Sequence, residues 1–153
     1  MNKLIIVGDA GVGKSSYVNK LKNKVFKETH IPTLGVENTN ISYKGFKFDI
    51  WDTSGTERCS GLKEGYYIGS NCALIMISDT KISYEKAENF KNMILRTCGN
   101  IPIVFVINKC ELDNANINYI NLQKKENNVI LISCKENICI YEPIDKIINL
   151  LNE

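Results

Sequence analysis

Gly8-Asp9-Ala10-Gly11-Val12-Gly13-Lys14-Ser15 is the stretch that decides the fold. It fits the pattern G-x-x-x-x-G-K-[S/T], and it lies between an apolar run typical of a strand and a stretch with helical spacing. The glycines let backbone N–H groups surround phosphate oxygens, and the helix N-terminus adds a partial positive charge. The alternative, a glycine-rich turn with an exposed lysine, leaves the order of strand, loop and helix unexplained. The sequence therefore predicts a loop that binds a nucleoside triphosphate.

Short β-branched runs bounded by Gly, Pro, Asn or Asp predict buried strands elsewhere in the chain. These runs are Lys3–Val7, Phe46–Trp51, Ala73–Ile77, Ile101–Ile107 and Val129–Ile132. Val36–Tyr43 predicts a further strand, joined to Phe46–Trp51 as a hairpin through Lys44-Gly45. Helical spacing predicts helices over Ser15–Lys24, Ser83–Cys98, about Asn116–Lys125 and Ile138–Leu151. Strands that alternate with helices imply an α/β fold, in which a mostly parallel sheet is covered on both faces.

Composition excludes several classes of protein. The 153 residues are 44% apolar and 24% charged, and they show no repeat or linker, so we expect a single domain over 1–153. A net charge of +2 is too small to grip nucleic acid or an anionic membrane without help. We expect no membrane span, signal peptide or lipid anchor in this chain. The six cysteines are irregularly spaced and are expected to be free thiols.

Three later motifs follow predicted strands. Asp52-Thr53-Ser54-Gly55 comes first, then Asn108-Lys109-Cys110-Glu111, and then Ser133-Cys134-Lys135. Loops at the carboxyl ends of strands are where α/β sheets bind ligands. An Asp in such a loop can hold Mg²⁺ through water, and a Gly N–H can contact a γ-phosphate. Each motif alone is a weak signal, but their order and separation are informative together.

In this order the motifs resemble those of the Ras-like small GTPases over essentially the full length of the chain. The branch with the greatest resemblance is Ran, which acts in nuclear transport. The residues that carry this second resemblance are Thr33–Glu37, Gly61–Ile68 and Asn100–Val104. The resemblance implies a P-loop NTPase fold, with a six-stranded sheet, one antiparallel strand and five helices on the two faces.

The resemblance also implies the ligands, GTP or GDP with Mg²⁺, and the residues that hold them. The phosphate contacts fall on Gly11, Val12, Gly13, Lys14, Ser15 and Ser16, and the γ-phosphate contact on Gly55. The guanine contacts fall on Phe26, Asn108, Lys109, Glu111, Ser133, Cys134 and Lys135. The Mg²⁺ ligands fall on Ser15, Thr33 and Asp52, and the catalytic positions on Lys14, Thr33, Gly55 and Thr56. Phe26 is equally compatible with a place in the core.

Three positions depart from the family pattern. Thr56 stands where the family has the Gln that orients the attacking water, and its short, β-branched side chain is too short to reach that water. Ala10 replaces a glycine and adds a methyl group beside the γ-phosphate, although some branches of the family tolerate a small side chain there. Glu111 replaces the Asp that reads guanine. Because its carboxylate is one methylene further out, we expect a weakened preference for guanine.

These observations leave two readings of function open. The first is a Ran-like GTP/GDP switch that hydrolyses GTP slowly to GDP and phosphate. The second is a GTP-bound binding module with essentially no turnover, which occupies transport-receptor or effector partners. A small-molecule kinase is disfavoured, because it needs lid arginines and the chain has only Arg58 and Arg96. We expect a monomer of the cytoplasm and nucleus that meets an exchange factor and an activating protein. Where the resemblance to Ran implies a basic patch, residues 112–132 offer only Lys124-Lys125. The acidic C-terminal tail of Ran has no counterpart within residues 1–153, so we expect either a trimmed extension or a protein without that control.

Overall fold

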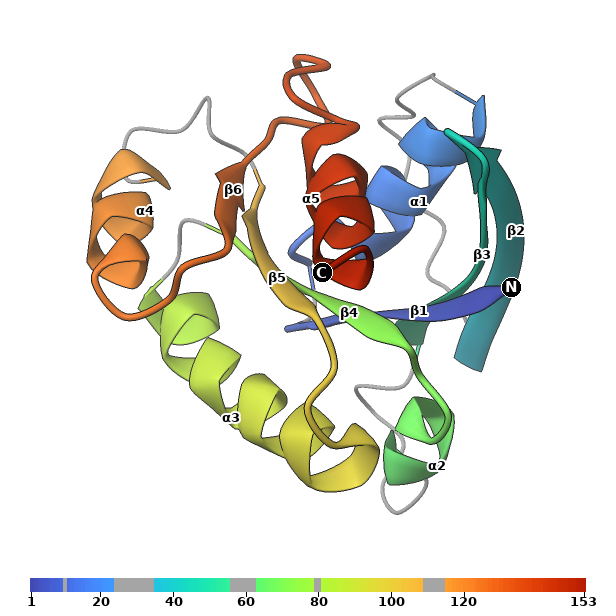
Figure 1. Cartoon of the computed structure of the whole chain (residues 1–153). Coiled ribbons are helices and arrows are strands. Elements are labelled where there is room, and N and C mark those ends of the chain that lie inside the picture. The colour runs from blue at the N-terminus through green and yellow to red at the C-terminus, as the bar shows by residue number, and fades with distance from the viewer. Residues whose placement is uncertain (10, 24–34, 56–62, 79–80, 109–114) are drawn as a thin grey trace.

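The computed structural model describes residues 1–9, 11–23, 35–55, 63–78, 81–108 and 115–153. A six-stranded sheet runs through the centre, with the strand order β2-β3-β1-β4-β5-β6 (Figure 1). Its strands are β1 (Asn2–Gly8), β2 (Gly35–Tyr43), β3 (Phe46–Gly55), β4 (Cys72–Ile77), β5 (Ile103–Ile107) and β6 (Val129–Leu131). β2 pairs with β3 in antiparallel orientation, and the remaining pairs are parallel. The predicted α/β class with one antiparallel strand is confirmed.

Helices cover both faces of this sheet (Figure 1). They are α1 (Lys14–Asn23), α2 (Lys63–Tyr67), α3 (Lys81–Cys98), α4 (Ala115–Gln123) and α5 (Glu142–Leu151). Buried side chains of α1 and α5 share one core with the sheet, whereas those of α2, α3 and α4 share the other. Among the helices that the structure describes, none combines the length and the apolar character needed to cross a membrane.

The central strand β1 shows why its sequence is a continuous apolar run. Leu4 and Ile6 point into the core beneath α1 and α5, whereas Ile5 and Val7 point into the core beneath α3. All four side chains are fully buried. Successive side chains of a strand alternate between faces, so a strand covered on both sides must be apolar at every position.

The β2–β3 hairpin turns through Lys44-Gly45, as the sequence predicts. Both residues have positive φ, 49° at Lys44 and 82° at Gly45, and Tyr43 pairs with Phe46 across the turn. Positive φ at both central residues gives the turn a twist that matches the twist of paired strands. The hairpin therefore closes without a longer loop.

The largest difference from the expected elements is at the last helix. α5 begins at Glu142, so the prediction of a helix from Ile138 is wrong by four residues. Asn137 and Cys139 have φ of 57° and 56°, in the left-handed region that no right-handed helix contains. Ile140 is buried even so, which explains why its apolar side chain fitted the helical pattern. The five-residue α2 was not predicted, because one turn is too short to show a helical period.

The described cysteines are free thiols, as expected, and they are Cys72, Cys98, Cys134 and Cys139. Cys59 and Cys110 lie outside the described residues. Cys72 begins β4 and is fully buried among the side chains of the α1/α5 core. Burial disfavours the charged thiolate and raises the pKa of Cys72 to about 12.

We expect Cys72 to resist alkylation in the folded protein at about pH 9, and to react rapidly once the chain is unfolded. Because the unfolded thiol ionises near its ordinary pKa, this residue lowers the free energy of unfolding as pH rises from about 8.5 towards 12. The loss is at most about 1.4 kcal/mol per pH unit. Iodoacetamide labelling followed by peptide mapping, with and without urea, measures the difference. Equal labelling rates in the two states would contradict the burial.

Candidate functional site

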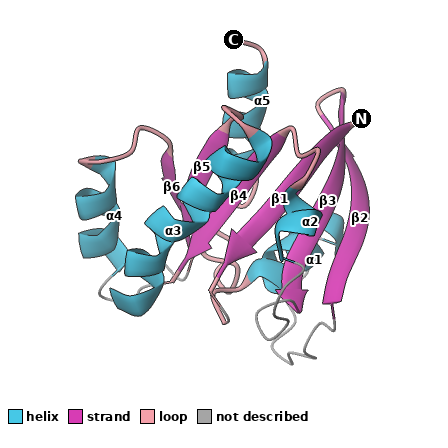
Figure 2. Cartoon of the chain, turned by 90° about the horizontal axis from the view of Figure 1, so that it is seen from below, coloured by secondary structure: helices cyan, strands magenta, loops and turns pink. Residues whose placement is uncertain are grey.

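The parallel strands bring the predicted motifs to one edge of the sheet. β1, β3, β4, β5 and β6 all run in the same direction, so their carboxyl ends meet along that edge (Figure 2). The phosphate-loop motif follows β1 and leads directly into α1. The other motifs come from the ends of β3, β5 and β6. This arrangement is the usual location of a ligand site in an α/β sheet.

Two glycines in the phosphate-loop motif are required by close packing. Gly8 faces the backbone of β4, and a Cβ atom there would collide with the carbonyl oxygen of Met76. Gly13 has φ of 99°, and a Cβ atom there would collide with the side-chain nitrogen of Asn108. The glycines thus let the loop lie directly against β4 and the loop after β5.

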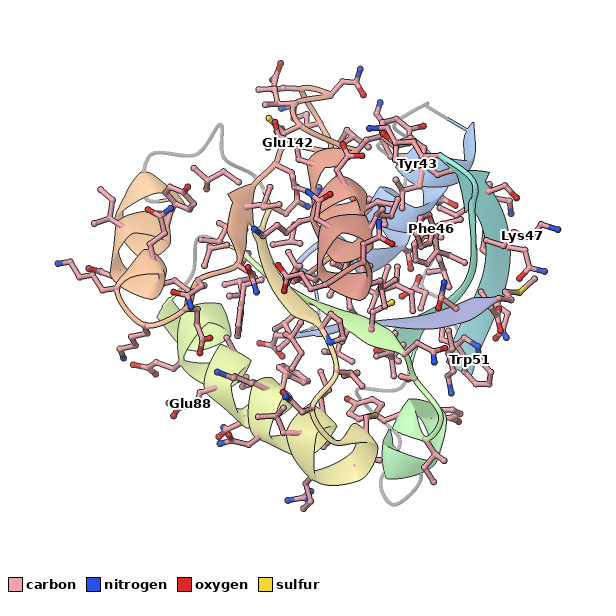
Figure 3. All side chains as sticks on the ribbon, viewed as in Figure 1. Tyr43, Phe46, Lys47, Trp51, Glu88 and Glu142 are labelled. Atoms are coloured by element: carbon pink, nitrogen blue, oxygen red, sulfur yellow. The ribbon has the colours of Figure 1, made fainter. Side chains whose placement is uncertain are left out.

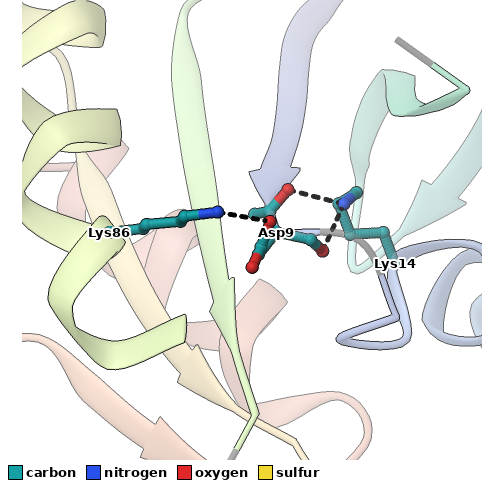
Figure 4. Close-up of polar contacts among 4 residues, drawn as sticks. Asp9, Lys14 and Lys86 are labelled. Atoms are coloured by element: carbon teal, nitrogen blue, oxygen red, sulfur yellow. Dashed lines mark hydrogen bonds and ion pairs between the residues drawn. The ribbon is translucent and has the colours of Figure 1, made fainter. Parts of the chain in front are cut away.

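Lys14 is buried at the start of α1 and is only 3% exposed. Its ammonium nitrogen donates hydrogen bonds to the carbonyl oxygens of Gly8 at 2.6 Å and of Asp9 at 2.9 Å (Figure 4). These bonds hold the charged group against the backbone of its own loop. The positive charge of a buried ammonium within this loop is what would attract a phosphate anion, which can replace the carbonyl oxygens as hydrogen-bond acceptor.

Asp9 carries a contact that the sequence did not predict. Its carboxylate lies 3.2 Å from the ammonium nitrogen of Lys86 on α3 (Figure 4). The side chains are 29% and 49% exposed, so the pair contributes only about 0.2–1 kcal/mol. It ties the phosphate loop to the helix on the other face. A charged residue within the loop was visible in the sequence, but nothing in the sequence identified Lys86 as its partner.

Ser15 and Asp52 come together although they are 37 residues apart. The Ser15 hydroxyl donates a hydrogen bond of 2.6 Å to the carboxylate of Asp52, which is 1% exposed. The next residue, Thr53, donates from its hydroxyl to the carbonyl oxygen of Ile6 at 2.8 Å and so fixes the end of β3 against β1. A hydroxyl and a carboxylate are oxygen donors of the kind that Mg²⁺ prefers. These two side chains fit the predicted metal ligands.

Asn108 joins the phosphate loop to the predicted guanine loop. Its side-chain nitrogen donates to the carbonyl oxygen of Val12 at 3.0 Å, and its side-chain oxygen accepts from the backbone N–H of Cys134 at 3.2 Å. Asn108 is 2% exposed and Ser133 is fully buried. The Ser133 hydroxyl accepts from the backbone N–H of Glu136 at 3.0 Å and supports the turn that presents Lys135 to solvent.

The remaining predicted site residues divide into two groups. Gly11 is exposed at the tip of the loop, Val12 is buried and Ser16 is half-buried in the first turn of α1. Gly55 ends β3 and pairs with Gly35 of β2. Six positions lie outside the described residues, namely Ala10, Phe26, Thr33, Thr56, Lys109 and Glu111. The structure therefore brings together the described members of the predicted phosphate set, two of the three predicted metal ligands, and the described members of the predicted base set. The roles expected for Thr33 and Thr56 stay predictions.

The fold and this edge define an α/β protein of the P-loop GTPase type. The sequence model of the Ras family matches residues 3–152 of the chain. The protein belongs to the Ras family. It is accordingly a small GTP-binding protein and GTPase, of a family that binds guanine nucleotide, typically with Mg²⁺, and engages regulators and effectors.

The close approach of Gly13 to Asn108 can be tested by substitution, with Gly11 of the same loop as the control. Gly13→Ala and Gly11→Ala both place a methyl group at positive φ. At Gly11, however, no atom of the described residues beyond its chain neighbours lies within 4 Å of the Cβ position. We expect Gly11→Ala to lower the free energy of unfolding by about 1–2 kcal/mol. Gly13→Ala should cost at least about 2 kcal/mol more, because it also displaces the buried amide of Asn108. Urea unfolding without nucleotide measures both, and equal losses would contradict the close approach.

Proposed function

We propose that this protein is a GTP/GDP switch whose Mg²⁺ is held by Ser15, Thr33 and Asp52. The observation that carries the proposal is the 2.6 Å hydrogen bond between Ser15 and Asp52. It joins the end of the phosphate loop to β3, the strand that ends at Gly55 directly before Thr56. Bound Mg²⁺ neutralises negative charge on the β- and γ-phosphates. Loss of the γ-phosphate or of the metal would therefore affect both the phosphate loop and the end of β3.

The protein's own residues divide the work of binding. Lys14, with the loop from Gly11 to Ser16, holds the phosphates, and the N–H of Gly55 meets the γ-phosphate. Asn108, Lys109 and Glu111 hold guanine together with Ser133, Cys134 and Lys135, and Phe26 stacks on the base. Asn108 supports this assignment, because its hydrogen bonds to Val12 and Cys134 put the phosphate and base loops in a fixed relation.

The phosphate end of the proposal is tested by replacing Lys14. Lys14→Ala removes the buried ammonium, so we expect the affinity for GTP and GDP to fall by at least about 100-fold. Lys22→Ala is the matched control, since Lys22 is an exposed lysine of the same helix. Calorimetry with MgGTP and MgGDP measures the effect. Unchanged affinity in Lys14→Ala would contradict the assignment of the loop, and a loss in Lys22→Ala would point to damage to α1 instead.

We further propose that hydrolysis is slow and that the protein rests in its GTP state. The support comes from the sequence. In-line attack needs a water held opposite the leaving oxygen, and Thr56 is too short to hold it as a Gln amide would. Ala10 adds bulk beside the same phosphate. Neither of these two departures from the family pattern removes a contact to phosphate or metal. We therefore expect GTP binding to be retained while hydrolysis is slowed.

Single-turnover hydrolysis of preloaded GTP tests this second proposal. We expect Thr56→Gln to raise the rate by about 10- to 100-fold, because correct placement of the water supplies much of the catalysis. Ala10→Gly, alone and combined with Thr56→Gln, separates the effect of the methyl group. A wild-type rate equal to that of Thr56→Gln would contradict the explanation.

The Ran-like residues favour a place in nucleocytoplasmic transport, with transport receptors or other effectors as partners and with the cytoplasm and nucleus as the location. We propose a monomer that is loaded by an exchange factor. If an activating protein accelerates the wild type to a fast rate, the chain is an ordinary switch. If GTP persists in the presence of such a protein, the alternative holds: a GTP-bound module that occupies its partners with essentially no turnover.

A further inference from the structure

Tyr17 of α1 makes a buried contact with a distant part of the chain. Its side chain is fully buried, and its hydroxyl donates a hydrogen bond of 2.8 Å to the carbonyl oxygen of Ile140, 123 residues further on. Its backbone N–H bonds to the carbonyl of Gly13, so Tyr17 belongs to the first turn after the phosphate loop. A phenylalanine could fill the same space in the core, so packing alone does not account for the hydroxyl of Tyr17. Its hydrogen bond to Ile140 does.

That partner belongs to a closed loop. Ser133 and Ile138 form an antiparallel bridge through two backbone hydrogen bonds, of 3.1 Å and 2.9 Å, and the four residues Cys134-Lys135-Glu136-Asn137 lie between them. Asn137 and Cys139 have positive φ on the returning side. Residues in that conformation persist only where surrounding contacts hold them. The carbonyl of Ile140, directly after Cys139, is where the Tyr17 hydroxyl provides such a contact.

The loop is thus held at both of its ends from the phosphate side of the site. Asn108 accepts from the N–H of Cys134 at one end and donates to Val12 of the phosphate loop. Tyr17 bonds to Ile140, two residues beyond the other end. Burial raises the pKa of Tyr17 well above its usual range, and the electrostatic influence of the nearby Cys134 thiol raises this pKa further. The phenol consequently stays neutral and keeps its proton for donation.

The outer side of the same segment is held by the β2–β3 hairpin. Tyr43, labelled in Figure 3 beside the end of α5 that begins at Glu142, stacks on Tyr141 with ring centroids 4.9 Å apart. The adjacent Lys44 forms a 2.8 Å ion pair with Asp145. These outer contacts are more exposed than the Tyr17 bond, and they reach the chain at Tyr141 and Asp145, which are further along the sequence from the Ser133–Ile138 loop than Ile140 is.

We propose that Tyr17 is a positioning residue for the base: through the carbonyl of Ile140 its hydroxyl fixes the Ser133–Ile138 loop and so sets the preference for guanine. The inference rests on the proposed function, in which that loop contacts the base. Tyr17 touches no ligand itself. A loop tied at one end only samples more positions, and each of its contacts to the base is then made for a smaller fraction of the time.

The test compares Tyr17→Phe with Tyr141→Phe. Each variant removes one phenolic hydroxyl and retains the ring, but only the first removes the bond to Ile140. Dissociation of fluorescent GDP, and competition by unlabelled GDP and ADP, are measured for both variants and the wild type. We expect Tyr17→Phe to speed GDP release by about three- to tenfold and to lower the GDP-to-ADP preference by a similar factor. Tyr141→Phe should stay within about twofold of the wild type.

The preference ratio separates positioning from stability. A Tyr17→Phe variant that loses GDP and ADP affinity equally, or loses only thermal stability, overturns the inference while the proposed function stands. A wild type that binds neither nucleotide overturns the proposed function and this inference with it. If Tyr17→Phe fails to fold, hydrogen exchange in the wild type decides: GDP must slow exchange at the N–H groups of Ser133 and Ile138 more than ADP does, and equal slowing overturns the inference.

Discussion

The side-chain amide of Asn108 is the contact on which the arrangement of the site depends. It lies at the end of β5, is almost fully buried, and joins Val12 of the phosphate loop to Cys134 of the loop after β6. Leaving either buried partner unsatisfied costs about 1–3 kcal/mol. The close approach is possible only because Gly13 has no Cβ atom. One amide and one missing side chain therefore fix the relation between two loops that are far apart in the sequence.

Much of this fold follows from the pattern of the sequence. The runs of buried β-branched residues gave the strands, because strands covered on both faces must be apolar at each position. The turn at Lys44-Gly45 followed from its short polar connection. The start of α5 could not be predicted. Asn137 and Cys139 have left-handed backbone conformations that exclude a helix, but Ile140 is buried and so fits the apolar spacing of one. Apolar spacing reports which residues are buried and not which backbone conformation buries them.

The site residues that belong to a sequence motif could be predicted. Those that matter through a contact with a distant part of the chain could not. Lys14, Ser15 and Asp52 could be identified because each residue type suits a phosphate or a metal. The bonds from Lys86 to Asp9 and from Tyr17 to Ile140 each involve at least one residue that belongs to no motif, and only the folded chain brings the partners together. For the same reason, Thr56 and Glu111 were noticed in the sequence only as departures from a family pattern.

The position of α5 in the chain has a consequence for how the protein is made. Ile144, Ile147 and Ile148 of this late helix cover the same core as Tyr17, Val18 and Leu21 of α1. The phosphate loop leaves the ribosome well before α5, so the face behind it is closed only after Glu142–Leu151 has emerged. Until then the apolar side of α1 and the central strands is open to chaperones and to other chains. The core behind the phosphate loop is therefore complete only after synthesis has passed α5, and a ligand that binds the folded state can stabilise it only from then on.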